Sequence, residues 1–465
     1  MKYEEFIAKK KPKVGYSGFD INQEWLNPNL FPYQVEIVKR ACKKGRYALF
    51  VDTGLGKSIM QMNFAYAVVE YTNKPVLILA PLAVVFQMQK EALKFGFKLN
   101  RITEDTKIEK GIYITNYEQL EKIKTQEFIG VVLDESSILK SFTGRTKNAL
   151  IEKFAQTPYK LACSATPSPN DFMELGNHSE FLNILSRLEM LSRFFINDTF
   201  DTGEWRLKKH AQDSFWSWVS EWAECVNSPS DLGYDGSSHI LPPLYESIYC
   251  VQFDDVKYMQ EGVLFSFNEQ NATTLAKNKK ASLEKRIDKL MDILMQNVYP
   301  HLVWVDTNIE SDEVFKTIKT KRPHLKIAQI KGSDSPESKA KVLNDFAENR
   351  IDVLITKSSI AGMGMNFQNA CNMSFLGLNY SYEKYYQAVR RMYRFGQKQA
   401  VNVNIILADN EIPIWENLQT KKSQHQEMKK MMTKSICENK TLSKSEVYVP
   451  KTLPLPSFLR SENAI

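Results

Sequence analysis

The sequence lacks closely spaced cysteines. Its 465 residues include six cysteines, and no two of them form a C-x-x-C pair. They are Cys42, Cys163, Cys225, Cys250, Cys371 and Cys437. Zinc sites and disulfide frameworks both depend on cysteines at characteristic spacings. The pattern therefore argues against either kind of stabilisation and predicts reduced thiols in a cytosolic protein.

Long apolar runs are missing as well. The N-terminal stretch MKYEEFIAKKKPK has no apolar segment of the kind found in signal peptides. No other stretch approaches the roughly 18 apolar residues needed to span a bilayer. We therefore expect a soluble protein without a membrane partner. The charge is nearly balanced, because 61 basic and 54 acidic residues give a formal net charge of +7. This mild excess permits a phosphate-backbone partner without requiring one.

Short apolar runs rich in β-forming residues recur in two parts of the chain. The first group covers residues 47–51, 76–80, 112–114 and 131–133, and the second covers 301–305, 327–330, 353–355 and 401–407. Helix-compatible stretches separate the runs. Buried strands that alternate with helices are typical of a parallel α/β sheet. Because the chain is also too long for one ordinary core, we predict two similar α/β lobes.

The composition divides the chain into five predicted segments. They are a lead-in (1–29), a first lobe (30–169), a mostly helical, aromatic-rich insertion (170–250), a second lobe (251–408) and a helical brace with a tail (409–465). The insertion contains Trp205, Trp216, Trp218 and Trp222. The last two lie one helical turn apart, a spacing that base stacking and core packing explain equally well. Packing is the favoured interpretation.

A glycine-rich loop follows the first predicted strand. The stretch Thr53-Gly54-Leu55-Gly56-Lys57-Ser58 leads into a helix-compatible segment. Glycines allow backbone N–H groups to curl around phosphates, and a helix N-terminus favours negative charge. Lys57 would reach the β- and γ-phosphates of ATP, and the Ser58 hydroxyl would bind Mg²⁺. Val51 occupies the position of the first glycine in the full P-loop pattern. A simple turn followed by a helix cap is therefore the alternative.

Two acidic residues end a later strand. Asp134 and Glu135 directly follow the apolar run Val131-Val132-Leu133. An aspartate in this position can hold Mg²⁺ through water, and the adjacent glutamate can orient and deprotonate an attacking water molecule. In isolation such a pair is more often part of a solvated loop. Together with the glycine-rich loop it predicts ATP hydrolysis, with Ser58 and Asp134 at the metal ion and Glu135 as the base.

The order of the motifs resembles that of a superfamily 2 helicase, most closely the Swi/Snf-like group of double-stranded DNA translocases. The resemblance covers about residues 30–408 and implies RecA-like lobes. Leu30-Phe31-Pro32-Tyr33-Gln34 resembles the upstream motif that reads adenine, which assigns Gln34 to the nucleotide. Ala80-Pro81-Leu82 with Glu91 is similar to a DNA-facing motif, although Met88 replaces the usual tryptophan. Cys163-Ser164-Ala165-Thr166-Pro167 is similar to the motif that couples hydrolysis to lobe movement, through Ser164, Ala165 and Thr166.

The sequence departs from the family after its paired acids. Helicase families often carry Asp-Glu-Ala-His at this point, whereas this chain has Asp134-Glu135-Ser136-Ser137. The metal-binding and water-activating acids are kept, but the histidine used in coupling is absent. We therefore expect transmission towards Ser164–Thr166 to differ in detail. Lys140 and Lys147 fall where the family has basic residues, and an exposed helix face explains them equally well.

The most specific motif lies in the second predicted lobe. The stretch from Gln387 to Gln397 matches the family's final pattern, Q-A-x-x-R-x-x-R-x-G-Q, at every defined position. The resemblance makes Arg391 and Arg394 the arginine fingers that reach the γ-phosphate, with Gln387 near the nucleotide. Their spacing of three residues would place the two arginines on one helical face. A basic surface helix is the alternative.

Another family motif precedes the arginines. Residues 358–367 contain Gly364, which the resemblance places beside the nucleotide because glycine permits a close backbone approach. The family's Trp-Asn-Pro is replaced by Tyr380-Ser381-Tyr382, so that its contacts are not assigned.

We interpret the chain as an ATP- and Mg²⁺-dependent motor on double-stranded DNA. It would grip the phosphate backbone and work as a monomer. A strand-separating DNA or RNA helicase is the near alternative, and a nucleotide-gated DNA clamp without processive motion is an alternative of another class. The absence of additional chromatin-reading modules favours the cytoplasm of a bacterial or phage-infected cell.

Overall fold

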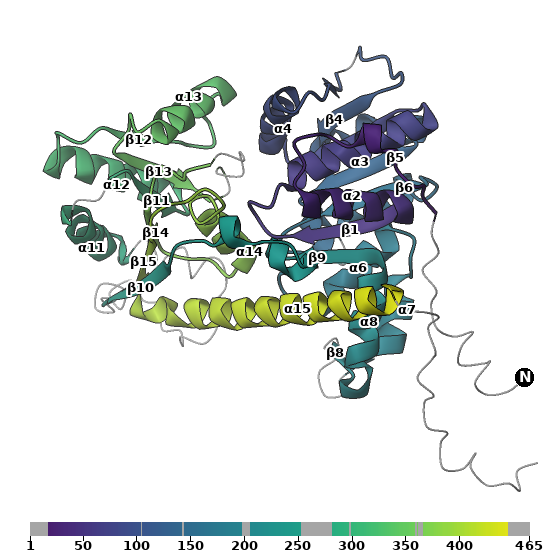
Figure 1. The fold of residues 1–465 in the computed structure, drawn as a ribbon. Coiled ribbons are helices and arrows are strands. Elements are labelled where there is room, and N and C mark those ends of the chain that lie inside the picture. The colour runs from purple at the N-terminus through teal and green to yellow at the C-terminus, as the bar shows by residue number, and fades with distance from the viewer. Residues whose placement is uncertain are drawn as a thin grey trace, which may run out of the picture.

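Two α/β lobes lie side by side and are crossed by one long helix near the C-terminus (Figure 1). The computed structural model describes residues 17–103, 105–141, 144–197, 205–252, 281–296, 299–358, 360 and 366–444. Each lobe contains a parallel sheet with helices packed against it. The predicted fold class is therefore confirmed.

The sheet of the first lobe carries the glycine-rich loop. Its strand order is β3-β4-β2-β5-β6-β1-β9, and every pairing between neighbours is parallel. The strands are β1 (Arg46–Val51), β2 (Val76–Ala80), β3 (Leu99–Arg101), β4 (Ile112–Asn116), β5 (Gly130–Asp134), β6 (Tyr159–Cys163) and β9 (Ala223–Val226). The central strands are buried along their whole length because helices cover both faces of the sheet.

The helices of the first lobe are α2 (Pro32–Lys44), α3 (Lys57–Thr72), α4 (Leu82–Lys94) and α5 (Arg145–Lys153). Helix α3 is buried on nearly all sides, since it packs between the sheet and its helical neighbours α2 and α4. A helix in that position has no polar face to offer to solvent. The few polar side chains that it buries, Gln61 and Asn63, therefore need partners within the protein.

The sheet of the second lobe has the order β10-β15-β14-β11-β13-β12 and is also parallel throughout. Its strands are β10 (Leu244–Val251), β11 (His301–Val305), β12 (Ile327–Gln329), β13 (Val353–Lys357), β14 (Asn372–Leu376) and β15 (Val401–Ala408). The helices are α11 (Leu283–Met295), α12 (Asn308–Lys321), α13 (Pro336–Ala347) and α14 (Tyr382–Val389).

The predicted insertion is only partly helical. It contains α6 (Leu175–Phe181), α7 (Arg187–Phe194), α8 (Gln212–Trp222) and the antiparallel pair β7 (Phe195–Asn197) and β8 (Trp205–Leu207). It also supplies β9 to the edge of the first sheet and β10 to the edge of the second. Trp216, Trp218 and Trp222 are buried in the first-lobe core, which agrees with the packing interpretation.

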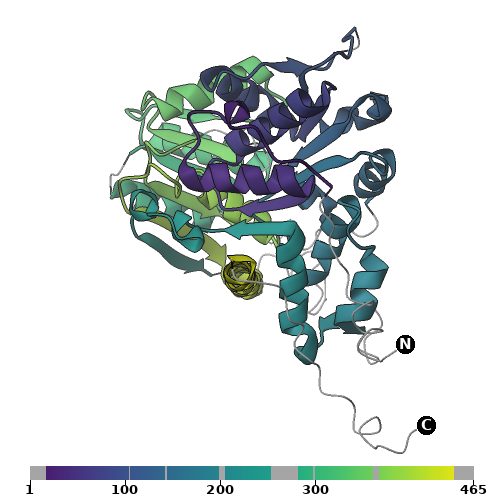
Figure 2. The same ribbon diagram turned by 45° about the vertical axis from the view of Figure 1, so that its right-hand side comes forward.

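Helix α15 (Ile412–Lys444) belongs to both lobes. At 33 residues it is about 50 Å long. Figure 1 shows it in yellow beneath both lobes, and Figure 2 views it nearly end-on. Ile414 and Leu418 join the core of the second lobe, whereas Met428, Met432 and Ile436 join a core of the first. Within the described ranges, α15 included, no helix combines the length and apolarity that a membrane crossing requires.

Candidate active site between the lobes

The glycine-rich loop turns tightly between β1 and α3. Gly54 and Gly56 have φ angles of +89° and +78°, in the left-handed region that favours glycine. A Cβ atom on Gly56 would lie 2.2 Å from the side-chain nitrogen of Gln34, and one on Gly54 would lie 2.9 Å from the backbone nitrogen of Phe395. Both glycines are therefore required by close packing as well as by conformation. The second contact also shows that the loop touches the second lobe.

Gln34 lies directly against this loop. Its side-chain nitrogen donates to the carbonyl of Leu55 at 2.9 Å, and its side-chain oxygen accepts from the backbone of Phe31 at 2.9 Å. The hydroxyl of Tyr33 donates to the same Leu55 carbonyl at 3.1 Å. The residue predicted to read adenine is thus fixed beside the phosphate loop, where it also holds the loop in place.

The paired acids of the first lobe lie within electrostatic reach of Lys57. The Lys57 ammonium donates to the carbonyls of Val51 (2.8 Å) and Asp52 (3.4 Å). Burial lowers its pKa, and the negative charges of Glu135, Asp52 and Asp134 oppose that shift. Asp134 accepts a 2.6 Å hydrogen bond from Gln61 on α3, and burial raises the pKa of this carboxyl. Gln61 thereby finds its partner at the end of β5.

Glu135 is held in an unusual conformation. Its backbone is left-handed, with φ 51° and ψ 53°, which costs on the order of 1 kcal/mol for a residue other than glycine. Burial and the neighbouring Asp134 carboxylate raise the pKa of Glu135 to about 7. A carboxylate with such a pKa is a better proton acceptor than an ordinary glutamate. Strain and a raised pKa at one residue are features of catalytic positions.

The arginines of the second lobe follow α14. The helix ends at Val389, so Arg391 and Arg394 lie in the turns after it and do not share the face of a regular helix. This corrects the expectation drawn from their spacing. Burial lowers the pKa of Arg391, while Glu135 and Asp134 oppose the shift. Burial and repulsion from Arg391 lower the pKa of Arg394 to about 10. The two guanidinium groups therefore repel each other, and Arg391 lies within electrostatic reach of Glu135 and Asp134 of the first lobe.

A buried carboxylate ties the two lobes together at the loop. Asp52, the residue after β1, accepts a hydrogen bond from Tyr386 and pairs with Arg390 at 2.5 Å and with Lys429 at 3.3 Å. Burial alone would raise the pKa of Asp52, but Lys429 and Arg390 hold it well below its ordinary value. Its other role is local, because it caps the backbone N–H of Thr53 at 2.7 Å.

A second link joins the lobes beside Glu135. Glu383 on α14 accepts a hydrogen bond from Ser137 and pairs with Lys140. Ser137 stands where helicase families often have histidine, so in this chain a serine makes the inter-lobe contact at that position. Glu383, Tyr386 and Arg390 are spaced by three and four residues, and all three contact the first lobe. One side of α14 and its C-terminal turn is thus the docking face of the second lobe.

Ser136, the residue before Ser137, contacts a histidine from helix α6. Ser136 lies 3.1 Å from the Nε2 atom of His178 on α6. Burial lowers the pKa of this histidine to about 4.

The coupling residues predicted by resemblance lie at the end of strand β6, next to β5 in the sheet. Ser164 accepts from the backbone of Thr166 at 3.0 Å and donates its own N–H to Leu49 of β1 at 3.1 Å. Ala165 is buried between them.

The arrangement fits a nucleotide triphosphate with a divalent cation. Lys57 and the N-terminus of α3 offer positive charge to phosphates, and Ser58 lies in the first turn of that helix. The Nε atom of Arg394 is buried and makes no hydrogen bond within the described ranges. Asp134 supplies a carboxylate for a hard cation. Gln387 lies on α14, and Gly364 lies outside the described residues.

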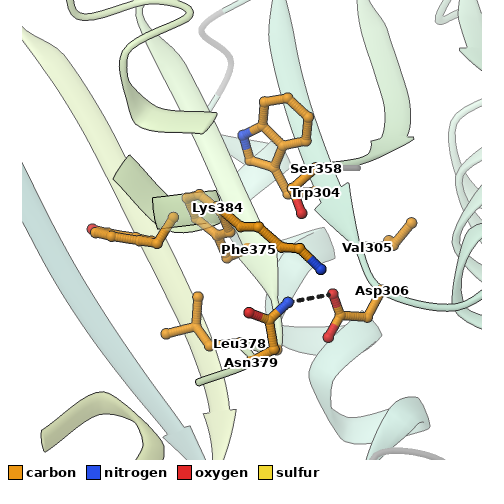
Figure 3. A pocket seen from close by; sticks show the side chains of 10 residues that line it. Trp304, Val305, Asp306, Ser358, Phe375, Leu378, Asn379 and Lys384 are labelled. Carbon is orange, nitrogen blue, oxygen red and sulfur yellow. Dashed lines mark hydrogen bonds between the residues drawn. The ribbon is translucent and has the colours of Figure 1, made fainter. Parts of the chain in front are cut away.

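The hollow shown in Figure 3 is a different feature. It lies at the carboxyl ends of β11 and β14, where Asn379 donates to Asp306 at 3.3 Å and the Lys384 side chain points towards them. Its volume of about 20 Å³ has room for one water molecule, which excludes a nucleotide. The candidate site is therefore the inter-lobe surface around Lys57 and not this pocket.

Several residues at this surface were not predicted from the sequence. They are Asp52, Gln61, His178, Glu383, Tyr386, Arg390 and Lys429. Two signals in the sequence point to some of them. Glu383, Tyr386 and Arg390 share a helical spacing that leads into the arginine motif, and Gln61 is a polar residue within a strongly apolar helix. Nothing in the local sequence marks Lys429 or His178.

Family comparisons agree with this site. Residues 27–169 match the family described as "Type III restriction enzyme, res subunit", and residues 285–396 match the "Helicase conserved C-terminal domain". The first match contains the glycine-rich loop and the paired acids, and the second ends at the arginine motif. The two matches define the class: the chain is a superfamily 2 helicase-type ATPase.

Whole-chain relatives narrow the class. The chain is 22% identical over 455 residues to a SWI/SNF-related matrix-associated actin-dependent regulator of chromatin, subfamily A-like protein 1, from Xenopus tropicalis, covering 89% of this chain and 46% of the relative. A 97-residue stretch is 30% identical to the TATA-binding protein-associated factor mot1 of Aspergillus fumigatus, covering 21% of this chain and 5% of that protein. Over most of its length the chain is similar to Swi/Snf-like proteins, and it spans about half the length of these whole-chain relatives.

One solved structure matches the chain over nearly its whole length. The Sulfolobus solfataricus SWI2/SNF2 ATPase core in complex with dsDNA is 20% identical, with a TM-score of 0.41, and the match covers 93% of this chain and 97% of that one.

Proposed function

We propose that this chain is an ATP-driven motor that moves along double-stranded DNA. The observation that carries the proposal is a candidate site whose groups are divided between two lobes. Lys57, Asp134 and Glu135 come from the first lobe, and Arg391 faces those acids from the second. A site divided in this way couples the state of the nucleotide to the distance between the lobes.

The chemistry follows from the roles that the geometry permits. A bound magnesium ion would neutralise phosphate charge, held by Ser58 and Asp134. Glu135 would accept the proton of the attacking water molecule, for which its pKa of about 7 is suited. Arg391 and Arg394 would stabilise the negative charge that develops in the transition state, worth about 10³–10⁵ in rate in other nucleotide hydrolases.

Movement would result from repeated closing and opening of the lobes. If both lobes hold the phosphate backbone, a change in their spacing becomes a step along the track. Phosphate contacts carry no base identity, so stepping would be independent of sequence. The similarity to a SWI/SNF-related regulator of chromatin supports DNA as the track. The motor would work as a monomer, since one chain can supply both the acids and the arginines of the site.

The first test compares nucleic acids as activators. ATP hydrolysis is measured without nucleic acid and then with duplex DNA, single-stranded DNA and RNA at equal phosphate concentration. We expect duplex DNA to give the greatest stimulation, with a steep decrease as salt rises. Greater stimulation by RNA or by single strands would overturn the choice of track.

The second test separates moving from unwinding and from clamping. A triplex-displacement assay and a strand-separation assay are run in parallel on the wild type and on Glu135→Gln, which should bind ATP but not hydrolyse it. A duplex translocase displaces the third strand without separating the duplex, and only when Glu135 is present. Strand separation would indicate a helicase, whereas ATP-dependent binding without displacement would indicate a clamp.

A further inference from the structure

Helix α15 is anchored in both lobes by apolar contacts. Ile414 and Leu418, near its start, are buried in the core of the second lobe. Met428, Met432 and Ile436, farther along, are buried in a core of the first lobe. Each set follows the four-residue spacing of one helical face. The helix therefore crosses from one lobe to the other as a single rigid element.

Beside its first-lobe anchor the helix also reaches the phosphate loop. The Lys429 ammonium lies 3.3 Å from the Oδ2 atom of Asp52 and 3.4 Å from the hydroxyl of Tyr386. The side chains of Lys429 and Asp52 are each only 12% exposed. Burial opposes the charge on Lys429, but Asp52 holds its pKa above the ordinary value. This is an ion pair shielded from solvent, at which removal of one partner is costly.

Asp52 connects this pair to the catalytic lysine. Its carboxylate receives Arg390 from the second lobe and Lys429 from α15, while its backbone carbonyl and that of Val51 hold the Lys57 ammonium. The same carboxylate caps the N–H of Thr53. A displacement of Asp52 would therefore move the start of the loop that presents Lys57.

We propose that Lys429 makes α15 the third component of the ATP site. It is a positioning residue: with Arg390 it neutralises Asp52, and it thereby aligns the phosphate loop with the second lobe when the lobes close. Closure then requires α15 in its docked position. This inference rests on the proposed ATP hydrolysis and adds a contribution from a helix that neither family match includes.

The test measures kcat and KM for ATP with saturating duplex DNA. Lys429→Met should lower kcat about tenfold or more, since it leaves a buried carboxylate undercompensated. The KM for ATP should change less than about threefold, because the backbone cradle remains. Lys429→Arg should restore most of the activity, whereas a loss that arginine fails to rescue would overturn the proposal. The matched control is Lys430→Met, at the adjacent exposed position, which should behave as the wild type.

A double-mutant cycle shows whether Lys429 acts through Asp52. Once Asp52→Asn has removed the carboxylate, adding Lys429→Met should cause no more than about a twofold further loss. If the two losses multiply, Lys429 acts elsewhere and the inference is wrong. Thermal unfolding of each variant is measured alongside, and a cycle that appears only in melting temperature and not in kcat also overturns it. Absence of ATPase activity in the wild type would instead refute the proposed function.

Discussion

The two sides of the inter-lobe site are built in different ways. The first lobe assembles its side from separate loops that follow β1, β5 and β6, and these loops are distant in sequence. The second lobe takes its side from one continuous stretch, α14 and the turns after it. The first is a product of sheet topology, since parallel strands bring their carboxyl ends to one edge. The second depends on helical spacing only up to Arg390, and the turns after α14 place Arg391 and Arg394.

The two sides also differ in charge. The first presents Asp52, Asp134 and Glu135 around Lys57, whereas the second presents Arg390, Arg391 and Arg394. Acids and arginines on opposite sides of the inter-lobe surface attract each other, and their pairing reduces the cost of burying both. One residue breaks this pattern, because Glu383 is an acid on the arginine-rich side. The comparison predicts that binding depends mainly on the first side and turnover on both.

The largest effect is expected at Arg391. Arg391→Ala should lower kcat for ATP hydrolysis by about 10³, because the transition state loses a positive charge from the second lobe. ATP binding should weaken less than about tenfold, since Lys57 and the phosphate loop are unchanged. Single-turnover hydrolysis and an equilibrium ATP titration measure the two quantities. Lys398→Ala, at an exposed position in the same lobe, is the control. A variant that hydrolyses ATP normally would remove the second side from catalysis.

An intermediate effect is expected at Glu383, the acid on the arginine-rich side, and at its partner Ser137. Glu383→Gln and Ser137→Ala each remove the charge-assisted hydrogen bond between the lobes, which is worth about fivefold to tenfold in DNA-stimulated kcat. The double variant should lose little more than either single variant. Glu337→Gln, exposed on α13, provides the comparison for a lost carboxylate. Additive losses would show that Ser137 and Glu383 do not act as a pair and that coupling follows another route.

The smallest effect concerns buried histidines, which both lobes contain. His178 in the first lobe and His301 in the second are buried, and burial lowers the pKa of each to about 4. The unfolded chain therefore binds more protons between pH 6.5 and 4, and stability must fall as the pH drops through that window. Each histidine contributes at most about 3 kcal/mol to this loss.

Substitution tests this acid dependence. His301 bonds Ser374 at 2.8 Å, so His301→Asn lowers stability at neutral pH but should flatten the decline between pH 6.5 and 4. Thermal unfolding at several pH values gives the measurement. The exposed His324→Asn should leave the slope unchanged. An unchanged slope in His301→Asn would mean that other groups cause the acid sensitivity.

Sequence patterns located many of the strands. The runs predicted around β1, β2, β4, β5, β11, β12, β13 and β15 are strands in the structure. Several strands with buried polar residues inside were not predicted. In β6 the buried Lys160 donates to the carbonyl of Phe181, in β9 the buried Glu224 pairs with Arg40, and in β14 Ser374 bonds His301. These polar groups are acceptable only because tertiary partners satisfy them, and no local pattern reveals those partners.

The site shows the same division. Its local part was predictable, since a phosphate loop needs glycines next to a lysine and a strand must end in acids to place them at the sheet edge. The predicted roles of Lys57, Glu135 and Arg391 are consistent with their mutual electrostatic influence and stay predictions until tested. The inter-lobe contacts were not predictable, because they depend on how finished surfaces dock.

What the sequence determined by itself is the fold class, the family and the presence of a phosphate loop. Each depends on residues that are adjacent or regularly spaced, so that local chemistry is sufficient. Only the tertiary structure decided that Asp52 meets Arg390 and Lys429, and that Ser137 meets Glu383. A buried charge requires a partner at a particular point in space, and the chain can supply that partner from any element that folding brings there.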